Sequence, residues 1–577
     1  MISMNANKNM TARGGIALLA VLMIVMVITV MALGFLSRSD VELACGENIV
    51  VRTQMDHLAE SGLEHARGLI LNPQDVASEY WTGEPLQQLV AGSGDYYDLT
   101  VTRDDTDPTN RCNYTIDCNS YRLSGSERIG RSNLRAELRL DPCIALWTGN
   151  DAIIWSGLVV NGDIYCNGNL ENRGTIDGDA FANTLSGNIS GRHKTAGDLS
   201  LSWPRVTVAD FTSNYATQTI TSGSLSGQTL GPYDPVRVCH RGGNLTLAGN
   251  VQIAGMLVVD GDLVVQGIRN IVTAAKNLPA LLVTGDLRIE NGCTLEVNGL
   301  VVVDGDMYVS SDAADIDIVG GLFVEGKLIQ TALDETGNNT GILFNGPIWQ
   351  PMGGNAGGAL DFNGDDTAVE IGTSGMDPLQ GTVSLWAYAS SFDGRAPLHH
   401  YLFGHTSTTD WTDTIQLYTY EGGNRLFLGL GDTHNRHADI QTLNTHTWYH
   451  IALTWNGTEY AVYVNGVEKA TGLYTGLSTL GPVAEIGNTG NPTYRIESWH
   501  GLIDDVRIYN QVLDANDIPP SDGLPGLVGH WKLDESGSSV TVTAAPSRTA
   551  IVTWSATGNV EKWSQAAGAF FKSIERR

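Results

Sequence analysis

The chain contains 577 residues and carries a formal net charge of −29. This length exceeds what one hydrophobic core can organise and predicts three or four domains of about 150 residues each. The acidic balance argues against nucleic acid as a partner, because binding to phosphates requires a basic surface. Only 17% of the residues are charged, 67 are glycine, and many short aliphatic runs stand between Gly-Asp and Asn-Gly pairs. This composition, with its short aliphatic runs between turn-forming pairs, indicates a mainly β protein.

Residues 16–36 form an apolar stretch that contains no charged residue and no proline. About 20 residues at about 1.5 Å each match a hydrocarbon core of about 30 Å, so the stretch predicts a single membrane-spanning helix. Lys8 and Arg13 precede it, and Arg38 follows it but is soon followed by Asp40 and Glu42. The positive-inside bias therefore places the N-terminus in the cytoplasm, the helix in the inner membrane and the remaining chain in the periplasm or outside the cell.

The leader, residues 1–15, is short and basic and ends in two glycines directly before the apolar stretch. A removable signal peptide would have an apolar core of about 7–15 residues and a small-x-small cleavage site, and neither is present. The leader instead resembles the processing site of type IV prepilins and type II secretion pseudopilins. The resemblance implies that a prepilin peptidase cuts after Gly15, that the mature chain begins at Ile16, and that it assembles with other pilin or pseudopilin subunits. Most members have a glutamate where this chain has Ala20, but PilX-type minor pilins and the large minor pseudopilin tolerate the change.

Beyond the apolar stretch, apolar residues continue at helical spacing without a proline and predict one long helix over residues 16–72, with an amphipathic second half. An ordinary anchor followed by a juxtamembrane helix explains this periodicity equally well. Residues 96–142 then alternate between apolar and polar positions, so that residues 73–143 are predicted to form a small antiparallel sheet packed on residues 50–72. This order of helix and β-meander resembles that of pilins.

The chain has seven cysteines, an odd number that leaves at least one unpaired in an oxidising compartment. We expect Cys112 and Cys118 to form a disulfide, because they would close a hairpin-sized loop. No pair of CxxC motifs is present, which argues against a structural zinc site.

Residues 144–330 predict a parallel β-solenoid. An element of two apolar residues, any residue, Gly-Asp and a further apolar residue recurs at intervals of roughly 20 residues, within the range of solenoid coils. The segment resembles the β-helical segments that follow PilX-like N-termini. Residues 192–240 are less regular and are expected to form an insertion. We interpret the recurring aspartates as corner residues, with a cation-binding edge as the alternative; they are Asp163, Asp179, Asp262, Asp286 and Asp306.

Residues 331–526 form a succession of strands that resembles a concanavalin A-like, laminin G-type (LamG) jelly roll. The resemblance depends most on GGALDFNGDD, HIALTWNGTEYAVYVNG and IDDVRIYN. Residues 527–577 form a C-terminal extension. Its GLVGHWKLDES looks like the opening strand of another such module, and its LDESG repeats the LDETG of residues 333–337. Because too little chain follows for a second jelly roll, we expect this strand to return to the first one.

Oxygen-bearing side chains early and late in the jelly roll are candidate calcium ligands, because calcium takes about 6–8 oxygen ligands and LamG-type domains often hold this ion at their rim. Ordinary turn chemistry explains the same residues equally well. The candidates are Asp361, Asn363, Asp365, Asp366, Asp504 and Asp505.

Aromatic side chains of the jelly roll could fill its core or form a sugar-binding platform. We expect Trp386, Trp448 and Trp455 to lie in the core. Trp411 and Trp499 are the candidate ligand contacts.

The sequence lacks the ExDxxE, GxSxG, P-loop and GxGxxG contexts, and we expect no enzymatic activity. The leading hypothesis is a pilin-like or pseudopilin-like envelope protein that presents its LamG-type domain for adhesion to a glycan or surface protein, or for export. One alternative is an uncleaved, membrane-anchored carbohydrate-binding protein. Another is a β-helix enzyme that acts on polysaccharides, which rests on fold analogy alone.

Overall fold

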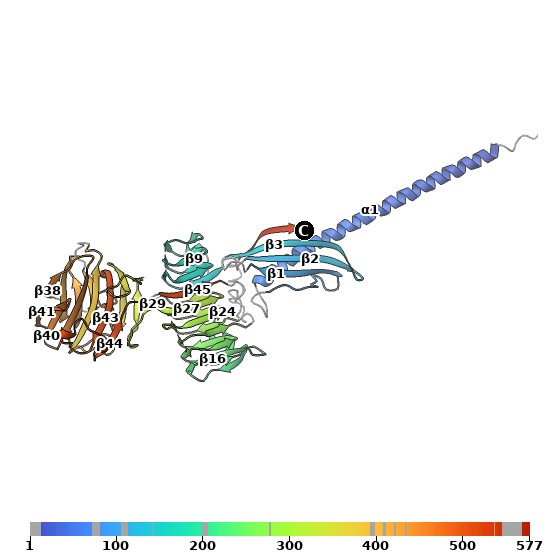
Figure 1. Ribbon diagram of the computed structural model, residues 1–577. Coiled ribbons are helices and arrows are strands. Elements are labelled where there is room, and N and C mark those ends of the chain that lie inside the picture. Colours follow the sequence, from blue (N-terminus) through green and yellow to red (C-terminus); the bar gives the residue numbers. More distant parts are fainter. Residues whose placement is uncertain are drawn as a thin grey trace, which may run out of the picture.

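The computed structural model describes most of the chain and shows a long helix followed by three β bodies (Figure 1). The described residues are 13–71, 81–104, 113–141, 143–198, 206–275, 278–392, 399–407, 411–420, 423–432, 436–535, 537–544 and 568–576.

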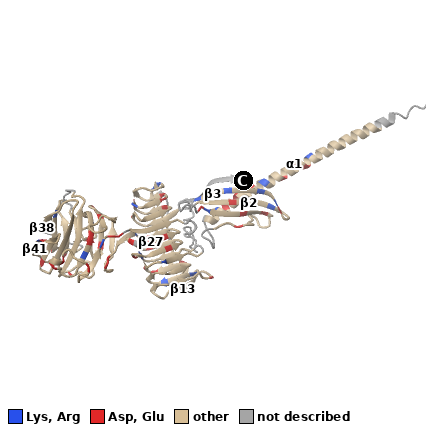
Figure 2. Cartoon of the chain, in the orientation of Figure 1, with Lys and Arg blue, Asp and Glu red and all other residues tan. Residues whose placement is uncertain are grey.

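The N-terminal helix α1 (Arg13–Leu71) contains 59 residues and confirms the predicted long helix. Its N-terminal half projects away from the rest of the protein (Figure 1), and no charged residue occurs between Arg13 and Arg38 (Figure 2). Residues 18–70 contain the one described stretch that is long and apolar enough to cross a membrane, with a mean hydropathy of 2.9 in its best window, none of which is buried. The structure therefore supports a membrane anchor or signal sequence at this end of the chain.

The C-terminal half of α1 packs on the predicted small antiparallel sheet, which consists of β1 (Asp95–Arg103), β2 (Asn113–Ser124) and β3 (Glu127–Asp141). Met55, Ala59 and Leu63 on the helix are almost fully buried against it. A C-terminal strand, β46 (Gly568–Arg576), adds antiparallel to β3 and becomes the fourth strand of the sheet on which α1 packs.

The predicted Cys112–Cys118 disulfide is wrong, because Cys118 is a free thiol and is fully buried. Cys118 lies on the face of β2 that the helix covers, and a Cβ on Gly62 of α1 would lie only 2.5 Å from its sulfur. The alternation along β2 thus turns Cys118 into the core. Cys143 is disulfide-bonded, and Cys112 lies outside the described residues.

The second body confirms the predicted parallel β-solenoid and has three faces. The first face is one sheet whose strands are, in spatial order, β12 (His193–Lys194), β10 (Ala180–Phe181), β7 (Asp163–Cys166), β4 (Ile144–Thr148), β28 (Leu322–Val324), β25 (Val301–Val303), β22 (Leu281–Val283), β19 (Met256–Asp260), β16 (Arg237–Gly242) and β13 (Ala216–Thr219). The second is β15 (Thr229–Leu230), β18 (Gln252–Ala254), β21 (Asn270–Thr273), β24 (Thr294–Asn298), β27 (Asp312–Val319), β45 (Gly537–Thr543), β6 (Leu158–Asn161) and β9 (Thr175–Asp177).

The third solenoid face is divided into two separate sheets. One sheet contains β14 (Ser224–Leu225), β17 (Leu245–Ala248), β20 (Leu263–Gln266), β23 (Leu287–Ile289), β26 (Met307–Ser310) and β29 (Leu328–Ala332). The other contains β5 (Ala152–Ile154), β8 (Asn169–Asn172) and β11 (Thr184–Ser186).

The solenoid does not wind in chain order. The chain enters at β4 in the middle of the stack, winds outward to β12, and crosses through η2 (Ala196–Asp198) and α2 (Val208–Thr212) to the opposite end at β13. It then winds back until β28 pairs with β4. The predicted insertion over residues 192–240 is therefore wrong in part, because β13 to β16 are regular coil strands.

The Gly-Asp pairs form a hydrogen-bonded ladder along one corner of the solenoid. Asp262 Oδ1 accepts the Asp286 N–H at 3.0 Å, and Asp286 Oδ1 accepts the Asp306 N–H at 3.0 Å. Asp163 and Asp179 continue the pattern in the other half of the stack, at 2.8 Å. The interpretation as corner residues is thus confirmed: each carboxylate satisfies a backbone donor of the next coil.

The third body is a jelly roll of two sheets. The first continues from β29 through β30 (Gly341–Phe344), β33 (Ala368–Gly372), β42 (Val483–Ile486), β35 (His400–His405), β36 (Thr414–Thr419), β37 (Arg425–Gly431) and β38 (Arg436–Thr442). The second is β31 (Ile348–Gln350), β32 (Ala359–Asn363), β43 (His500–Tyr509), β34 (Gly381–Ala389), β39 (Trp448–Trp455), β40 (Glu459–Val464) and β41 (Val467–Leu473).

The C-terminal extension links the three β bodies. After the turn η3 (Ala515–Asp517), β44 (Leu527–Trp531) pairs with β43, so the strand returns to the first jelly roll as predicted. The chain then re-enters the solenoid as β45, which fills the position between β27 and β6 and completes one coil. Val540 and Val542 of β45 are almost fully buried in the solenoid core.

Two chain crossings join the solenoid to the jelly roll, and they carry the repeated LDETG and LDESG sequences. Asp334 of the outgoing crossing accepts the His530 N–H at 2.8 Å. Glu535 of the returning crossing accepts the Leu333 N–H at 2.9 Å. Burial raises the pKa of Glu535 from 4.5 to about 8, although the Leu333 hydrogen bond acts in the opposite direction. Each repeat thus supplies a buried carboxyl that holds the other crossing.

We expect Val542→Asp to destabilise the protein by more than about 3 kcal/mol, because it places a charge without a partner inside the solenoid core. Ser539→Asp is the matched control, since Ser539 is exposed on the same strand. Thermal unfolding and limited proteolysis of the full chain measure the effect. Equal stability of the two variants would show that β45 does not complete the core.

We expect stability to fall as pH rises from about 4.5 to about 8, because folding raises the pKa of Glu535 and so favours its protonated form. Glu535→Gln should flatten this part of the curve of Tm against pH. Asp504, whose pKa burial raises to about 7, accounts for a remaining slope. Glu335→Gln in the other crossing is the control, because Glu335 is half-exposed and pairs with Lys532 at the surface. An unchanged slope in Glu535→Gln would contradict the assignment.

Candidate functional site

The first group of predicted calcium ligands forms a self-contained turn after β32. Asn363 Oδ1 accepts the N–H groups of Asp365 at 2.8 Å and Asp366 at 3.1 Å. Its amide nitrogen donates to Asp366 Oδ1 at 2.8 Å. Asp361 lies on β32, two residues before Asn363, and receives a long hydrogen bond of 3.5 Å from Gln350. This is the Asx-turn chemistry that the sequence allowed as the alternative to a metal site.

The second group lies on β43 and serves other partners. Asp504 is 1% exposed, and its Oδ2 accepts the N–H groups of Asn355 at 2.8 Å and Ala356 at 3.2 Å. Asp505 contacts Arg507 Nε at 2.9 Å and His530 Nε2 at 2.7 Å. These hydrogen bonds outweigh the effect of burial and lower the pKa of Asp505.

The six predicted ligands therefore do not surround one common point. Among the described residues, no group of three or more His, Cys, Asp or Glu side chains could hold a metal ion. The prediction that an early and a late strand of the jelly roll are neighbours is confirmed, because β32 pairs with β43. The sequence could not show that these carboxylates already form hydrogen bonds and ion pairs with a turn, a loop and neighbouring side chains. A calcium ion held by all six residues does not fit this arrangement.

The predicted roles of three tryptophans are wrong. Trp499, a predicted ligand contact, is 1% exposed and packs in the jelly-roll core. Trp386 and Trp448, predicted core residues, are half-buried on the outer face of their sheet. The alternation of side chains along a strand explains the positions of Trp386 and Trp448, because Leu385 on β34 and Tyr449 on β39 take the inward positions. Trp455 lies in the core as predicted.

The outer face of β34 and β39, together with His446 just before β39, carries a group of aromatic side chains. We call Trp386, Tyr388, His446 and Trp448 the aromatic face. The ring centroids of Tyr388 lie 5.5 Å from Trp448 and 5.8 Å from His446. Because all four side chains are half-buried or exposed, part of each ring is open to solvent. Half-exposed rings of this kind can stack on the apolar faces of sugars.

A buried histidine supports the aromatic face from one side. The ring centroid of His450 lies 5.2 Å from that of Trp386, and its Nε2 lies 2.8 Å from Ser384 Oγ. Burial lowers the pKa of His450 to about 4. The imidazole is therefore neutral near pH 7 and packs against Trp386 without bringing a charge to the surface.

The other sheet carries a second aromatic group on its outer face. Tyr401 and Tyr418 are buried and stack at 4.9 Å between ring centroids. At the rim, the half-buried Trp411 meets the exposed Tyr494 edge-on at 5.5 Å. Trp411 thus stays a predicted ligand contact.

Sequence reasoning missed the ion pairs that hold the loop containing Arg495 to this sheet. Arg495 pairs with Glu370 on β33 and with the fully buried Glu485 on β42. Its guanidinium also lies 3.7 Å from the centroid of the Phe344 ring. Burial raises the pKa of Glu485, although Arg495 opposes the rise. A charged residue between the apolar Ala484 and Ile486 was the available signal for Glu485, but nothing in the sequence indicated its partner.

Comparison with protein families matches residues 322–519 to the concanavalin A-like lectin/glucanases superfamily. The matched segment includes both sheets of the jelly roll. The search of curated proteins found no match.

Several solved structures resemble part of the chain. Trypanosoma rangeli sialidase is 15% identical, with 33% of this chain and 32% of that chain covered and a TM-score of 0.24. Domain 4 of AbnA, an extracellular arabinanase from Geobacillus stearothermophilus solved with arabinotriose, is 19% identical, with 30% and 80% covered and a TM-score of 0.22. The CBM40 of Ruminococcus gnavus IT-sialidase, bound to α2,3 sialyllactose, is 16% identical, with 30% and 96% covered and a TM-score of 0.23. This chain thus spans less than a third of the sialidase. The family match and the two-sheet topology together establish that residues 322–519 contain a concanavalin A-like domain.

Proposed function

We propose that this protein is a membrane-anchored carbohydrate-binding protein whose β bodies stand outside the cytoplasm. The observation that carries the proposal is the aromatic face on a concanavalin A-like domain, at the opposite end of the molecule from the apolar helix (Figure 1). Trp386, Tyr388 and Trp448 present apolar ring surface, and their polar atoms stay available at the edges. Such a surface suits the alternating apolar and hydroxyl-bearing sides of a sugar ring.

We propose binding without turnover. Hydrolysis of a glycoside requires two carboxyl groups that reach the substrate. Asp504 faces the same side of the sheet as Trp386, and its raised pKa of about 7 would suit a general acid. However, the backbone of Asn355 and Ala356 covers its carboxylate, which leaves it 1% exposed. Asp504 therefore positions a loop and does not contact a ligand.

We expect Trp386→Ala and Trp448→Ala each to weaken glycan binding about tenfold or more, because each removes a stacking surface. Binding of the full-length protein in detergent to an oligosaccharide array measures the effect. Tyr96→Ala is the matched control, because Tyr96 is a half-buried aromatic residue of the distant small sheet. A loss of binding in Tyr494→Ala alone would instead assign recognition to the Trp411–Tyr494 rim.

We further propose that the protein is a pilin-like or pseudopilin-like subunit of a type IV pilus or type II secretion-like system. The support is the basic leader that ends at Gly15 together with one unbroken helix that continues from the apolar stretch into the first β body. In this arrangement the exposed apolar half of α1 packs with equivalent helices of other subunits. The uncleaved anchor is the alternative.

We expect the mature protein to begin at Ile16, and Gly15→Leu to block this processing. N-terminal sequencing of protein purified from membranes of its native host checks both expectations. Gly34→Leu is the control, since Gly34 lies in open space on the same helix, beyond the leader. A mature chain that retains the leader would contradict assembly into a filament and would favour the permanently anchored form.

A further inference from the structure

The third face of the solenoid has an opening where the other two faces are continuous. On the first face β28 pairs directly with β4, and on the second β45 bridges β27 and β6. On the third face β29 does not pair with β5. Instead, β29 turns its free edge to β30 of the jelly roll, through Thr331 and Ala332 alone. The coils therefore separate where the jelly roll begins.

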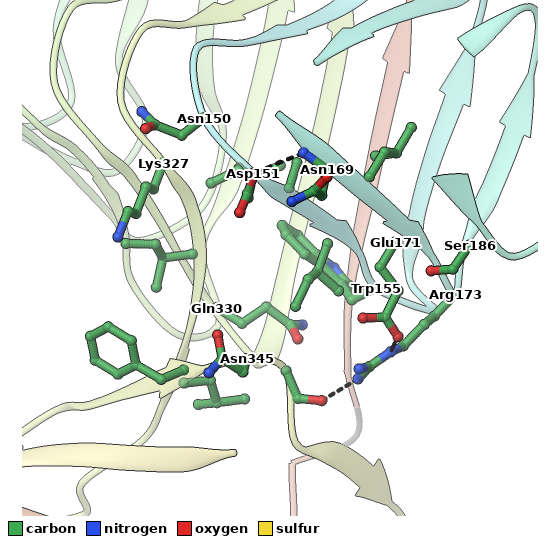
Figure 3. Close-up of a pocket in the computed structure, with 18 of the residues that line it drawn as sticks. Asn150, Asp151, Trp155, Asn169, Glu171, Arg173, Ser186, Lys327, Gln330 and Asn345 are labelled. Carbon is green, nitrogen blue, oxygen red and sulfur yellow. Dashed lines mark hydrogen bonds and ion pairs between the residues drawn. The ribbon is translucent and has the colours of Figure 1, made fainter. Parts of the chain in front are cut away.

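A cavity of about 890 Å³ occupies this opening, between the edge of β29 and the edge of β5 (Figure 3). We call it the seam cavity. Asn150 Nδ2 donates to the Glu325 carbonyl at 3.2 Å and ties the coils together at one end. At the other end, Arg173 donates to the Gly346 carbonyl of the jelly roll and pairs with Glu171 at 2.6 Å. The cavity size falls within the range of about 300–1,000 Å³ that small-molecule sites occupy.

Side-chain amides dominate the polar lining of the seam cavity. Each amide offers two donors and one acceptor oxygen, which suits neighbouring hydroxyl groups. The six amides are Asn150, Asn167, Asn169, Gln330, Asn345 and Asn363. Of these, the side chains of Asn167 and Gln330 form no hydrogen bond with other described residues, so their amides are free to bind a ligand.

The charge of the lining is almost balanced, although the whole chain carries −29. The acidic lining residues are Asp151, Glu171 and Asp366, and the basic ones are Lys327 and Arg173. A strongly anionic ligand would find no excess of positive charge here, and a strongly cationic ligand would find an excess of only one acidic residue. An uncharged polar ligand fits this balance.

One aromatic residue of the lining has a polar atom without a partner. Trp155 is 6% exposed and lines the cavity, and its buried Nε1–H donates to no described residue. A buried donor left without an acceptor costs about 1–3 kcal/mol. A ligand hydroxyl, or a water molecule in the free protein, would satisfy it.

We propose that the seam cavity binds an uncharged oligosaccharide and is a second carbohydrate site, separate from the aromatic face. Free amides, a balanced charge and one unsatisfied indole donor are the features that hydroxyl groups complement. An extended peptide fits less well, because β5 offers an edge of only three residues, Ala152–Ile154. The solenoid and the jelly roll both contribute to the cavity, so the ligand would hold the two bodies at a fixed angle.

The test measures binding of neutral oligosaccharides from cellulose, xylan, mannan and chitin to the full-length protein in detergent, by calorimetry. We expect at least one of these probes to bind, and the Asn167→Ala/Gln330→Ala variant to weaken that binding about tenfold or more. Gln252→Ala is the matched control, because Gln252 is exposed on a distant coil of the same solenoid. Trp155→Phe, which keeps a ring but removes the indole donor, should also weaken binding without a change in Tm larger than that of the control.

The outcomes separate this proposal from the function proposed for the aromatic face. Loss of binding in Trp386→Ala with full binding in Asn167→Ala/Gln330→Ala would overturn the seam site and leave the aromatic face intact. The reverse pattern would support the seam site and reject the aromatic face. Binding of an extended peptide in place of every neutral oligosaccharide, or no binding at all, would overturn the seam proposal.

Discussion

The fold of this protein depends on the parallel stacking of coils that cannot bury their apolar side chains alone. Because the chain enters the solenoid in the middle of the stack, the coils before and after the crossover have edges that must meet there. The pairing of β28 with β4 joins them on one face, and β45 joins them on another. A strand from the C-terminal extension thus supplies core residues to a domain that begins almost 400 positions earlier (Val540 beside Leu158).

This closure turns the jelly roll into an insertion in the solenoid. The chain leaves at β29 and returns at β45, and the two crossings hold each other through Asp334 and Glu535. Two crossings restrict the angle between the bodies more than one linker would. Because the chain leaves the third face at β29, the seam cavity opens there. The insertion of the jelly roll between β29 and β45 therefore also creates the cavity beside it.

Periodic features of the sequence predicted the long helix, the small sheet and the solenoid, because each follows from a local pattern of 3.6, 2 or about 20 residues. The jelly roll was predicted from the resemblance of its strand segments to LamG-type domains. The corner aspartates followed from the same repeat. The order of the solenoid coils did not, because parallel coils of similar sequence can stack in more than one order. The return of β45 to the solenoid was not predicted either, because the sequence of a seven-residue strand does not specify which strands it pairs with.

Side-chain roles were predicted less well than strands, and the tryptophans show why. Trp386 stands in the apolar strand β34 and Trp499 directly before the apolar strand β43, and an apolar neighbourhood alone does not decide which of the two enters the core. A shift of one residue exchanges the two faces of a strand. On β34 the phase set by Val383 and Leu385 turns Trp386 outward. On β43 Trp499 lies just before the strand and turns inward, where its indole nitrogen donates to the Tyr388 carbonyl at 3.2 Å. The surface that we assign to carbohydrate therefore depends on packing contacts between strands far apart in the sequence.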